Sequence, residues 1–313
     1  MIHSRNNSVS RSMKTATGSR NGERKEMKFT KMQGCGNDYI YVNCFEENVQ
    51  DPSDLAVKLS DRRYGIGSDG LILIEPSDRA DAFMHMFNRD GSEGKMCGNG
   101  IRCVAKYIYD NGIVPPERKD VLIDTKAGLR EIRLDIKDGK AAAASVDMGI
   151  AEVAAEPENI AVGGIDLCFT AVSTGNPHAV FFLDDNPALS GITDEDTSGG
   201  GGDCTLLSRI PLEIIGPEIE SSGRFPDGVN AEFVEMISPE EICFRVWERG
   251  SGETYACGTG ATAAVAAGCF AGKLACKVLV HLRGGDLEIE CDIDTGRCIM
   301  TGPAVTVFTG ELL

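Results

Sequence analysis

One stretch of sequence occurs twice in this chain, 160 positions apart. The first copy, FNRDGSEGKMCGNG, covers residues 87–100, and the second, WERGSGETYACGTG, covers residues 247–260. At equal spacing the copies share an aromatic residue, an arginine, a glutamate, a cysteine and two glycines: Phe87 and Trp247, Arg89 and Arg249, Glu93 and Glu253, Cys97 and Cys257, Gly98 and Gly258, Gly100 and Gly260. This repetition indicates two similar structural units that arose by internal duplication.

The similarity extends beyond these two loops. GCGNDYIYV near the start of the chain has a counterpart in STGNPHAVFF, which aligns Asn37 with Asn176. The second unit is longer because it contains DNPALSGITDEDTSGGGGDC, an acidic and glycine-rich tract. Such a composition cannot bury enough apolar surface to offset its ordering entropy. We therefore expect residues 186–204 to form a mobile surface loop.

The composition excludes several classes of partner. The chain has 313 residues, a formal net charge of −17 and an apolar fraction of 42%. We expect no nucleic-acid partner, because neutralising phosphates requires clustered Lys and Arg. No apolar run approaches the ~20 residues of a membrane-spanning helix, so no membrane partner is expected either.

The first 26 residues differ from the rest, being basic and without the apolar segment of a signal peptide. We expect residues 1–26 to be a disordered extension, with an organelle transit peptide as the alternative, and the folded chain to begin at Met27.

The 12 cysteines include no C-x-x-C pair and the four histidines are scattered, so no metal site is expected. Without an export signal we expect a cytoplasmic protein with reduced thiols. Most of these thiols lie in apolar patterns and should be small buried hydrophobes: Cys44, Cys243, Cys269 and Cys291.

Each unit combines many strand patterns with one helix. A helix is predicted after each cysteine, at 98–112 and 258–272, and the second is apolar on every side, which is typical of a buried helix. The strands do not show the regular alternation with helices of a doubly wound sheet. The expected fold class is therefore α/β, of a mixed, α+β-like kind, with two pseudo-symmetric domains at 27–145 and 146–313. In each, a curved mixed sheet should wrap around a central buried helix.

The repeated cysteines stand where a loop enters a helix. Unpaired N–H groups and the helix dipole give this position a partial positive charge, which should acidify a thiol. The backbone of Gly98, Asn99, Gly258 and Thr259 should also cradle an anion, such as a carboxylate. With the two loops face to face, one thiolate would remove an α-hydrogen and the opposite thiol would return a proton. This arrangement predicts a racemase or epimerase that needs no cofactor.

Five ordered motifs carry a family resemblance over residues 27–313: GCGNDY, FNRDGSEGKMCGNG, GNPH, RFPDGVN and WERGSGETYACGTG. Together they resemble the diaminopimelate epimerases, a cofactor-independent two-cysteine family. The resemblance implies two α/β domains with the active site between them, usually in a homodimer. It also implies interconversion of L,L- and meso-2,6-diaminopimelate in lysine and cell-wall precursor biosynthesis.

The resemblance also implies roles for individual residues. Cys97 and Cys257 would be the two acid/base residues, and His178 and Glu248 would tune their pKa values. The substrate-binding residues would be Asn37, Asn88, Gly98, Asn99, Asn176, Asn230, Glu248, Arg249, Gly258 and Thr259. Two departures stand out: Gly70 replaces a glutamine found in many members, and the insertion at 186–204 has no counterpart.

Three alternatives remain. GIGSDG, at 65–70, fits the dinucleotide-binding pattern G-x-G-x-x-G, but it precedes a predicted strand instead of opening a helix. A related two-cysteine racemase could act on another amino acid such as histidine, although Arg249 favours a substrate with a second carboxylate. A redox sensor could form a reversible disulfide between Cys97 and Cys257.

Overall fold

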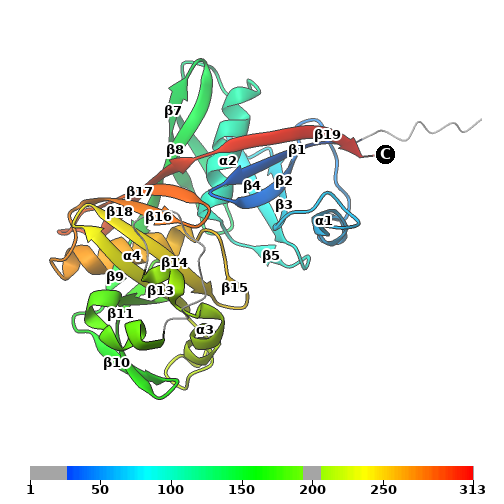
Figure 1. Ribbon diagram of the computed structural model, residues 1–313. Helices are drawn as coiled ribbons and strands as arrows, with labels where there is room; N and C mark the ends of the chain where they lie inside the picture. Colours follow the sequence, from blue (N-terminus) through cyan, green and yellow to red (C-terminus); the bar gives the residue numbers. More distant parts are fainter. Residues whose placement is uncertain (1–26, 193–205, 313) are drawn as a thin grey trace, which may run out of the picture.

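The computed structural model describes residues 27–192 and 206–312 (Figure 1). The expected extension at 1–26 and most of the expected insertion at 186–204 lie outside these residues. The described start of the insertion forms η2 (Pro187–Ile192). The Asn186 side chain bonds both the N–H and the carbonyl of Cys168, at 2.7 and 2.8 Å, and Leu189 is buried. The chain is therefore packed against β11 (Ile165–Ser173) as it enters this segment.

The first half of the chain contains eight strands and two helices among the described residues. They are β1 (Met27–Gly34), β2 (Asn37–Asn43), α1 (Pro52–Ser60), β3 (Gly70–Glu75), β4 (Ala82–Asn88), β5 (Glu93–Gly94), α2 (Gly98–Asp110), β6 (Asp120–Thr125), β7 (Arg130–Lys137) and β8 (Lys140–Ile150).

The second half follows the same plan with additions. Its elements are β9 (Glu152–Val153), β10 (Glu158–Val162), β11 (Ile165–Ser173), β12 (Pro177–Phe182), η1 (Leu183–Asp185), η2, η3 (Leu207–Arg209), α3 (Leu212–Glu220), β13 (Asn230–Ser238), β14 (Glu241–Glu248), β15 (Gly252–Glu253), α4 (Gly258–Phe270), β16 (Lys277–Leu282), β17 (Gly285–Cys291), β18 (Arg297–Pro303) and β19 (Val305–Leu312).

Strand pairing repeats between the halves. β2 pairs in parallel with β3, β3 antiparallel with β4, β4 in parallel with β6, and β6 antiparallel with β7. In the same order, β12 pairs in parallel with β13, β13 antiparallel with β14, β14 in parallel with β16, and β16 antiparallel with β17. The duplication seen in the sequence is therefore a duplication of topology.

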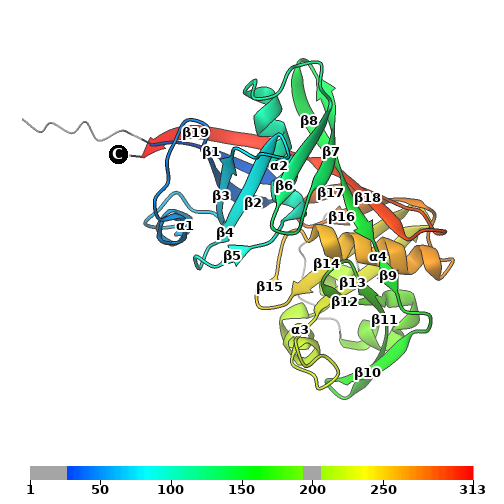
Figure 2. The ribbon, with the colours of Figure 1, turned by 180° about the vertical axis from the view of Figure 1, so that it is seen from behind.

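Two pairings join the halves into one sheet system. β8 pairs antiparallel with β7 of the first half and with β18 of the second, and it runs from one half towards the other (Figure 2). The last strand, β19, returns to pair antiparallel with the first, β1. The predicted boundary between residues 145 and 146 falls inside β8, and the division at this point stays a prediction.

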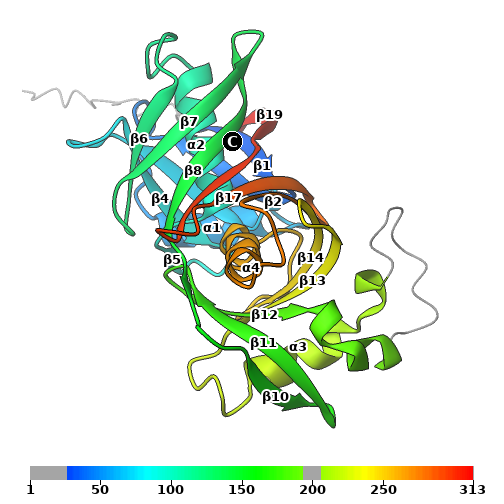
Figure 3. The same ribbon diagram turned by 90° about the vertical axis from the view of Figure 1, so that its left-hand side faces the viewer.

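Each half wraps a mixed sheet around one buried helix, which confirms the expected fold class. Figure 3 looks along α4 and shows strands curving around it. α4 is buried from Gly258 to Cys269 except at Thr259, and α2 is buried over most of its length. On the outer faces, α1 packs on β3 and β4, and α3 packs on β13 and β14.

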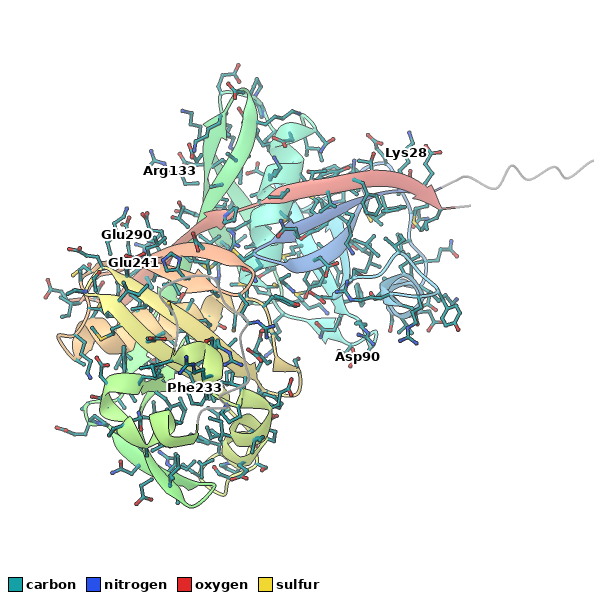
Figure 4. All side chains as sticks on the ribbon, viewed as in Figure 1. Lys28, Asp90, Arg133, Phe233, Glu241 and Glu290 are labelled. Carbon is teal, nitrogen blue, oxygen red and sulfur yellow. The ribbon has the colours of Figure 1, made fainter. Side chains whose placement is uncertain are left out.

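The outer face of the second half has its own apolar core. Phe233, labelled in Figure 4, is fully buried and stacks on Phe181 at a centroid distance of 5.1 Å.

Ten cysteines of the described residues are free thiols. Cys243 is disulfide-bonded, so the expectation of a reduced thiol is wrong at this position. None of the helices within 27–192 and 206–312 combines the length and apolarity needed to cross a bilayer.

Candidate active site

Each repeated cysteine occupies the N-cap of a buried helix. Cys97 precedes α2 in an extended conformation, and its sulfur accepts a hydrogen bond from Gly100 N–H at 3.4 Å. Cys257 precedes α4 in the same conformation, and its sulfur lies 3.4 Å from Thr259 Oγ1. Both sulfurs therefore lie beside the unpaired N–H groups of a helix N-terminus.

The two helix N-termini meet in the middle of the molecule. Asn99 Nδ2, in α2, donates to the carbonyl of Ala256 at 3.3 Å, immediately before the second cysteine. Met300 of β18 contacts both helices. A Cβ on Gly98 would lie 2.9 Å from Met300 Cε, and a Cβ on Gly258 would lie 2.8 Å from Met300 Sδ. Both helices therefore approach this methionine closely, and glycine at their first position leaves room for its side chain.

The Asn37 side chain lies against the first cysteine. The Cys97 thiol donates to Asn37 Oδ1 at 3.2 Å, and Asn37 Nδ2 donates to Asp69 Oδ2 at 2.8 Å. Arg62 in turn binds Asp69 at 2.9 Å and Asp38 at 2.7 Å. The amide is thus held in one orientation, with its oxygen towards the thiol, by a carboxylate from the loop before β3.

A buried pair of titratable groups lies in the second half. His178 Nδ1 is 2.6 Å from Glu232 Oε1, and both side chains are fully buried. His178 Nε2 is 3.0 Å from Asn176 Oδ1 and 3.0 Å from Thr174 Oγ1. Burial raises the pKa of Glu232 to about 7, against the opposing effect of His178. The bond from Glu232 to Nδ1 fixes the orientation of the imidazole ring, so that Nε2 points towards Asn176.

Glu248 ends β14 and lies beside the second cysteine. Its carboxylate accepts a hydrogen bond from Thr254 Oγ1 at 2.5 Å. Burial raises the pKa of Glu248, and hydrogen bonds from Thr254 and the Cys257 thiol oppose that shift. The hydrogen bond between this carboxyl group and the Cys257 thiol places them where a proton can pass from one to the other.

The remaining predicted binding residues lie at strand ends: Asn230 begins β13, Arg249 follows β14 and Asn88 ends β4. Asn230 Oδ1 accepts the N–H of Arg249 at 3.0 Å, and Asn230 Nδ2 donates to Pro177 O at 3.1 Å. The exposed Arg249 guanidinium donates to Asp227 O at 2.9 Å. Asn88 Nδ2, in the first half, donates to Ser92 Oγ at 3.0 Å. Arg249 is therefore held at the surface through one of its N–H groups, which leaves others directed outwards.

Sequence comparison identifies the family. The family model for diaminopimelate epimerase matches residues 29–154 and 170–307. Curated diaminopimelate epimerases of Acetivibrio thermocellus and Bacillus licheniformis are 47% and 48% identical to this chain over 300 and 301 residues. Each alignment covers 91% of this chain, with 98% and 97% of the respective relative. The chain belongs to the diaminopimelate epimerase family.

Solved structures at lower identity share the fold. A hydroxyproline epimerase from Agrobacterium vitis superposes with a TM-score of 0.63 at 16% identity, covering 93% of both chains. A phenazine biosynthesis protein of the PhzF family from Bacillus anthracis gives a TM-score of 0.64 at 15% identity, covering 92% of this chain and 99% of that one. These similarities show that two-unit folds of this kind extend beyond the diaminopimelate epimerases.

The environment of the two thiols differs from the expectation based on helix N-termini alone. Burial raises the pKa of Cys97, and hydrogen bonds from the Gly100 and Asn99 backbone only partly oppose this. Burial raises the pKa of Cys257 further, and the negative charges of Glu248 and Glu232 act in the same direction. Acidification was expected because the sequence does not reveal how completely both sulfurs are removed from water.

Arg102 is a site residue that the sequence did not single out. It is fully buried in the second turn of α2, where Nη1 donates to Gly98 O and Nε to Pro303 O, each at 3.2 Å. Among the described residues no carboxylate pairs with it at salt-bridge distance. Its charge favours the thiolate form of Cys97. The only sequence signal was an arginine on the polar face of a predicted helix.

Gly70 is required by packing. A Cβ at this position would lie 2.1 Å from Phe87 O and 2.8 Å from Tyr39 Cε1. The buried Tyr39 ring therefore lies where a longer side chain at position 70 would begin. Burial, followed by the charges of Cys97 and Asp69, raises the pKa of Tyr39 well above its usual value. The tyrosine is neutral and belongs to the wall of the site.

Among the described residues no group of three or more His, Cys, Asp or Glu is placed to hold a metal ion.

Proposed function

We propose that this protein interconverts L,L- and meso-2,6-diaminopimelate by a two-base mechanism without a cofactor. The observation that carries the proposal is the meeting of the two cysteine-capped helices at Met300, in a member of the diaminopimelate epimerase family. The backbone N–H groups of both helix N-termini (Gly98, Asn99, Gly258 and Thr259) bind the reacting carboxylate. The α-carbon then lies between two sulfurs.

In this proposal Cys97 is the base of the resting enzyme and Cys257 is the acid. The N–H groups of α2 and the charge of Arg102 favour a thiolate at Cys97 against the opposing charge of Glu248, whereas Glu248 and Glu232 both oppose one at Cys257. The Cys97 thiolate takes the α-proton, and the Cys257 thiol gives its proton to the opposite face. In the reverse direction the roles exchange.

The charge that develops on the substrate carboxylate is stabilised by groups already in place. Helix N-termini need no reorganisation to bind an enediolate-like oxygen, and their effect is strongest where water is excluded. Asn99 Oδ1 is buried without a hydrogen-bond partner among the described residues. We assign it to the substrate's α-ammonium group, which would supply the missing donor.

Recognition of the substrate beyond the reacting centre depends on the predicted binding residues at the strand ends. Arg249 grips the distal carboxylate with its planar fork, and Glu248 balances an ammonium group. The side-chain amides of Asn37, Asn88, Asn176 and Asn230 complete the polar shell. His178 and Glu248 set the protonation of the nearby thiol, and Glu232 acts through His178 as a positioning residue.

We further propose a cytoplasmic homodimer that functions in lysine and cell-wall precursor biosynthesis. The support for a dimer is the face of β19, where Val305, Val307 and Phe308 are 42%, 55% and 46% exposed. Apolar side chains gathered on one strand favour contact with a second copy.

Deuterium incorporation tests the proposed reaction. The reduced protein is incubated in deuterated water with L,L-diaminopimelate, and with L-histidine as the comparison substrate. We expect deuterium at the α-carbon of diaminopimelate together with formation of the meso isomer, and none in histidine. Exchange in histidine alone would overturn the substrate assignment. No α-exchange in either amino acid would overturn the proposed activity.

A further inference from the structure

Three cysteines outside the active site form a row across neighbouring strands. Cys291 ends β17, and Cys298 lies directly opposite it in β18. On the other side, the N–H of Cys291 donates to Cys276 O at 2.8 Å, one step beyond the paired residues Lys277 and Glu290. Figure 4 labels Glu290 at this end of the strands. Cys291 therefore lies between the other two cysteines.

The spacing of the row suits disulfide bonds. Residues directly opposite each other in an antiparallel pair carry their side chains on the same face. Asp292 N–H donates to Arg297 O at 2.9 Å, so Cys291 and Cys298 form the non-hydrogen-bonded pair, with Cα atoms about 4.5 Å apart. Cys276 and Cys291 form a hydrogen-bonded pair, at about 5.5 Å. Both distances lie within the roughly 4.4–6.8 Å that disulfides span.

Accessibility decreases along the row. Cys276 is exposed, whereas Cys291 and Cys298 are 2% and 0% exposed. A surface pocket of about 480 Å³ is lined by both Cys276 and Cys291, together with Lys277, Glu290, Asp292, Arg297 and Ile299. A small reagent in this pocket would thus reach the outer thiol, whereas the middle thiol is nearly closed to it.

The middle thiol is the one prepared to attack a disulfide formed by the outer thiol. Hydrogen bonds with Cys269, from the end of α4, and with Cys298 lower the pKa of Cys291, and the same bonds raise the pKa values of Cys269 and Cys298 while Cys291 is a thiolate. Thiolates are the attacking species in disulfide exchange. Cys269 is twelve residues beyond Cys257 on α4, so this neighbour of the row lies about 18 Å along the helix from the catalytic thiol at 1.5 Å per residue. The row is a separate site.

We propose that Cys276, Cys291 and Cys298 form a thiol–disulfide relay that accepts a disulfide from a small-molecule disulfide such as oxidised glutathione. The Cys276 thiolate attacks the reagent, forms a mixed disulfide and releases one thiolate. Cys291 attacks the Cys276 sulfur and displaces the second reagent thiolate. Cys298 then attacks the Cys291 sulfur, which frees Cys276. One reagent disulfide is reduced to two thiols, and two protein thiols become the buried Cys291–Cys298 disulfide.

Peptide mapping tests this relay because trypsin separates the three cysteines. Cleavage after lysine or arginine places Cys276 in 274–277, Cys291 in 284–297 and Cys298 in 298–313. The folded, reduced, full-length protein is treated with oxidised glutathione, alkylated at intervals and digested without reduction. We expect the linked pair 284–297 and 298–313 to accumulate. Glutathione adducts alone, with no linked pair, would overturn the proposal.

Two variants separate the steps. C276S removes only a surface thiol, and we expect it to slow formation of the linked pair at least about tenfold, since the buried thiols react poorly with reagents directly. In C298A we expect 274–277 linked to 284–297 to accumulate instead. C168S, which removes a half-buried thiol of β11, is the matched control and should behave as wild type. Formation of the Cys291–Cys298 disulfide at the wild-type rate in C276S would refute the relay.

Discussion

The two halves repeat the same frame but place different chemistry at equivalent points. The offset that relates the cysteines also relates Ile72 to Glu232. A Cβ on Gly100 would lie 2.8 Å from Ile72 Cδ1, and a Cβ on Gly260 would lie 2.8 Å from Glu232 Oε1. A methyl group and a carboxylate therefore occupy the same place beside the two central helices. Duplication kept the backbone arrangement, whereas the charges diverged.

The opposite charge appears on the other helix. Arg102 Nη1 bonds the carbonyl of Gly98 at 3.2 Å, and its equivalent Thr262 bonds the carbonyl of Gly258 through Oγ1 at 2.8 Å. The same backbone oxygen is thus satisfied by a cation in one half and by a neutral hydroxyl in the other. A symmetric frame with asymmetric charge allows two identical side chains to rest in different protonation states.

Removing either cysteine should cause the largest loss of epimerase activity. We expect Cys97→Ala and Cys257→Ala each to retain less than about a hundredth of the epimerase activity, because acid–base catalysis contributes roughly 10²–10⁴-fold and inversion needs both faces. Conversion of L,L- to meso-diaminopimelate is the measurement, with Cys44→Ala as the control. Higher activity in either variant would remove the two-base assignment.

Replacing the equivalent arginines of the two halves should change KM for diaminopimelate to different extents. Arg249→Lys keeps the charge but loses the planar fork, so KM for diaminopimelate should rise about tenfold or more. The matched control is Arg89→Lys, the equivalent exposed arginine of the first half, for which we expect an unchanged KM. Steady-state kinetics on both variants decide the matter. An equal effect, or none, would show that Arg249 has no special contact with substrate.

The buried carboxyl of Glu232 should make stability depend on pH. Its pKa of about 7 in the folded protein exceeds the ordinary value of 4.5, so the folded state holds this proton more tightly than the unfolded state. Its contribution is complete below pH 4.5 and is lost as pH rises through about 7, by up to about 1.4 kcal/mol per pH unit. Urea unfolding of Glu232→Gln at pH 5 and 7 should lack this slope, while Glu240→Gln, at an exposed position, should retain it.

The smallest expected effect is a difference in thiol reactivity. With limiting iodoacetamide near neutral pH, Cys97 should be alkylated severalfold faster than Cys257, because alkylation follows the thiolate fraction. Trypsin places the two thiols in different peptides, at 96–102 and 250–273, and because the second also contains Cys269, fragment-ion mass spectrometry is used to locate the label. Preferential alkylation of Cys257 would reverse the proposed resting states.

The sequence predicted the fold class and the meeting of the cysteine loops because both follow from the repeat. It did not predict the burial of Arg102 and Lys106. Spaced four apart on the helix after Cys97, they look like a solvated face. Lys106 instead donates to Ala141 O and to Asp110. Which face of a helix is covered depends on strands such as β8 that are distant in the sequence.

Glu232 was missed for a related reason. It lies in the strand pattern AEFVEMI, which contains two glutamates, Glu232 and Glu235, and the pattern gives no sign of which one is buried. Only the pairing of β13 between β12 and β14 turns it towards His178. The role of Gly70 likewise depends on a close approach to Phe87 that no local pattern contains.

The pairing of β19 with β1 has a consequence for synthesis on the ribosome. The strand that completes the first half consists of Val305–Leu312, which are made only after the whole second half. Until these residues leave the exit tunnel, β1 has only β2 as a neighbour and exposes an open edge. Such a long-range closure is slow to form. The nascent chain therefore cannot finish its first half until the second half has been made, and during this interval the edge is open to pairing with other chains.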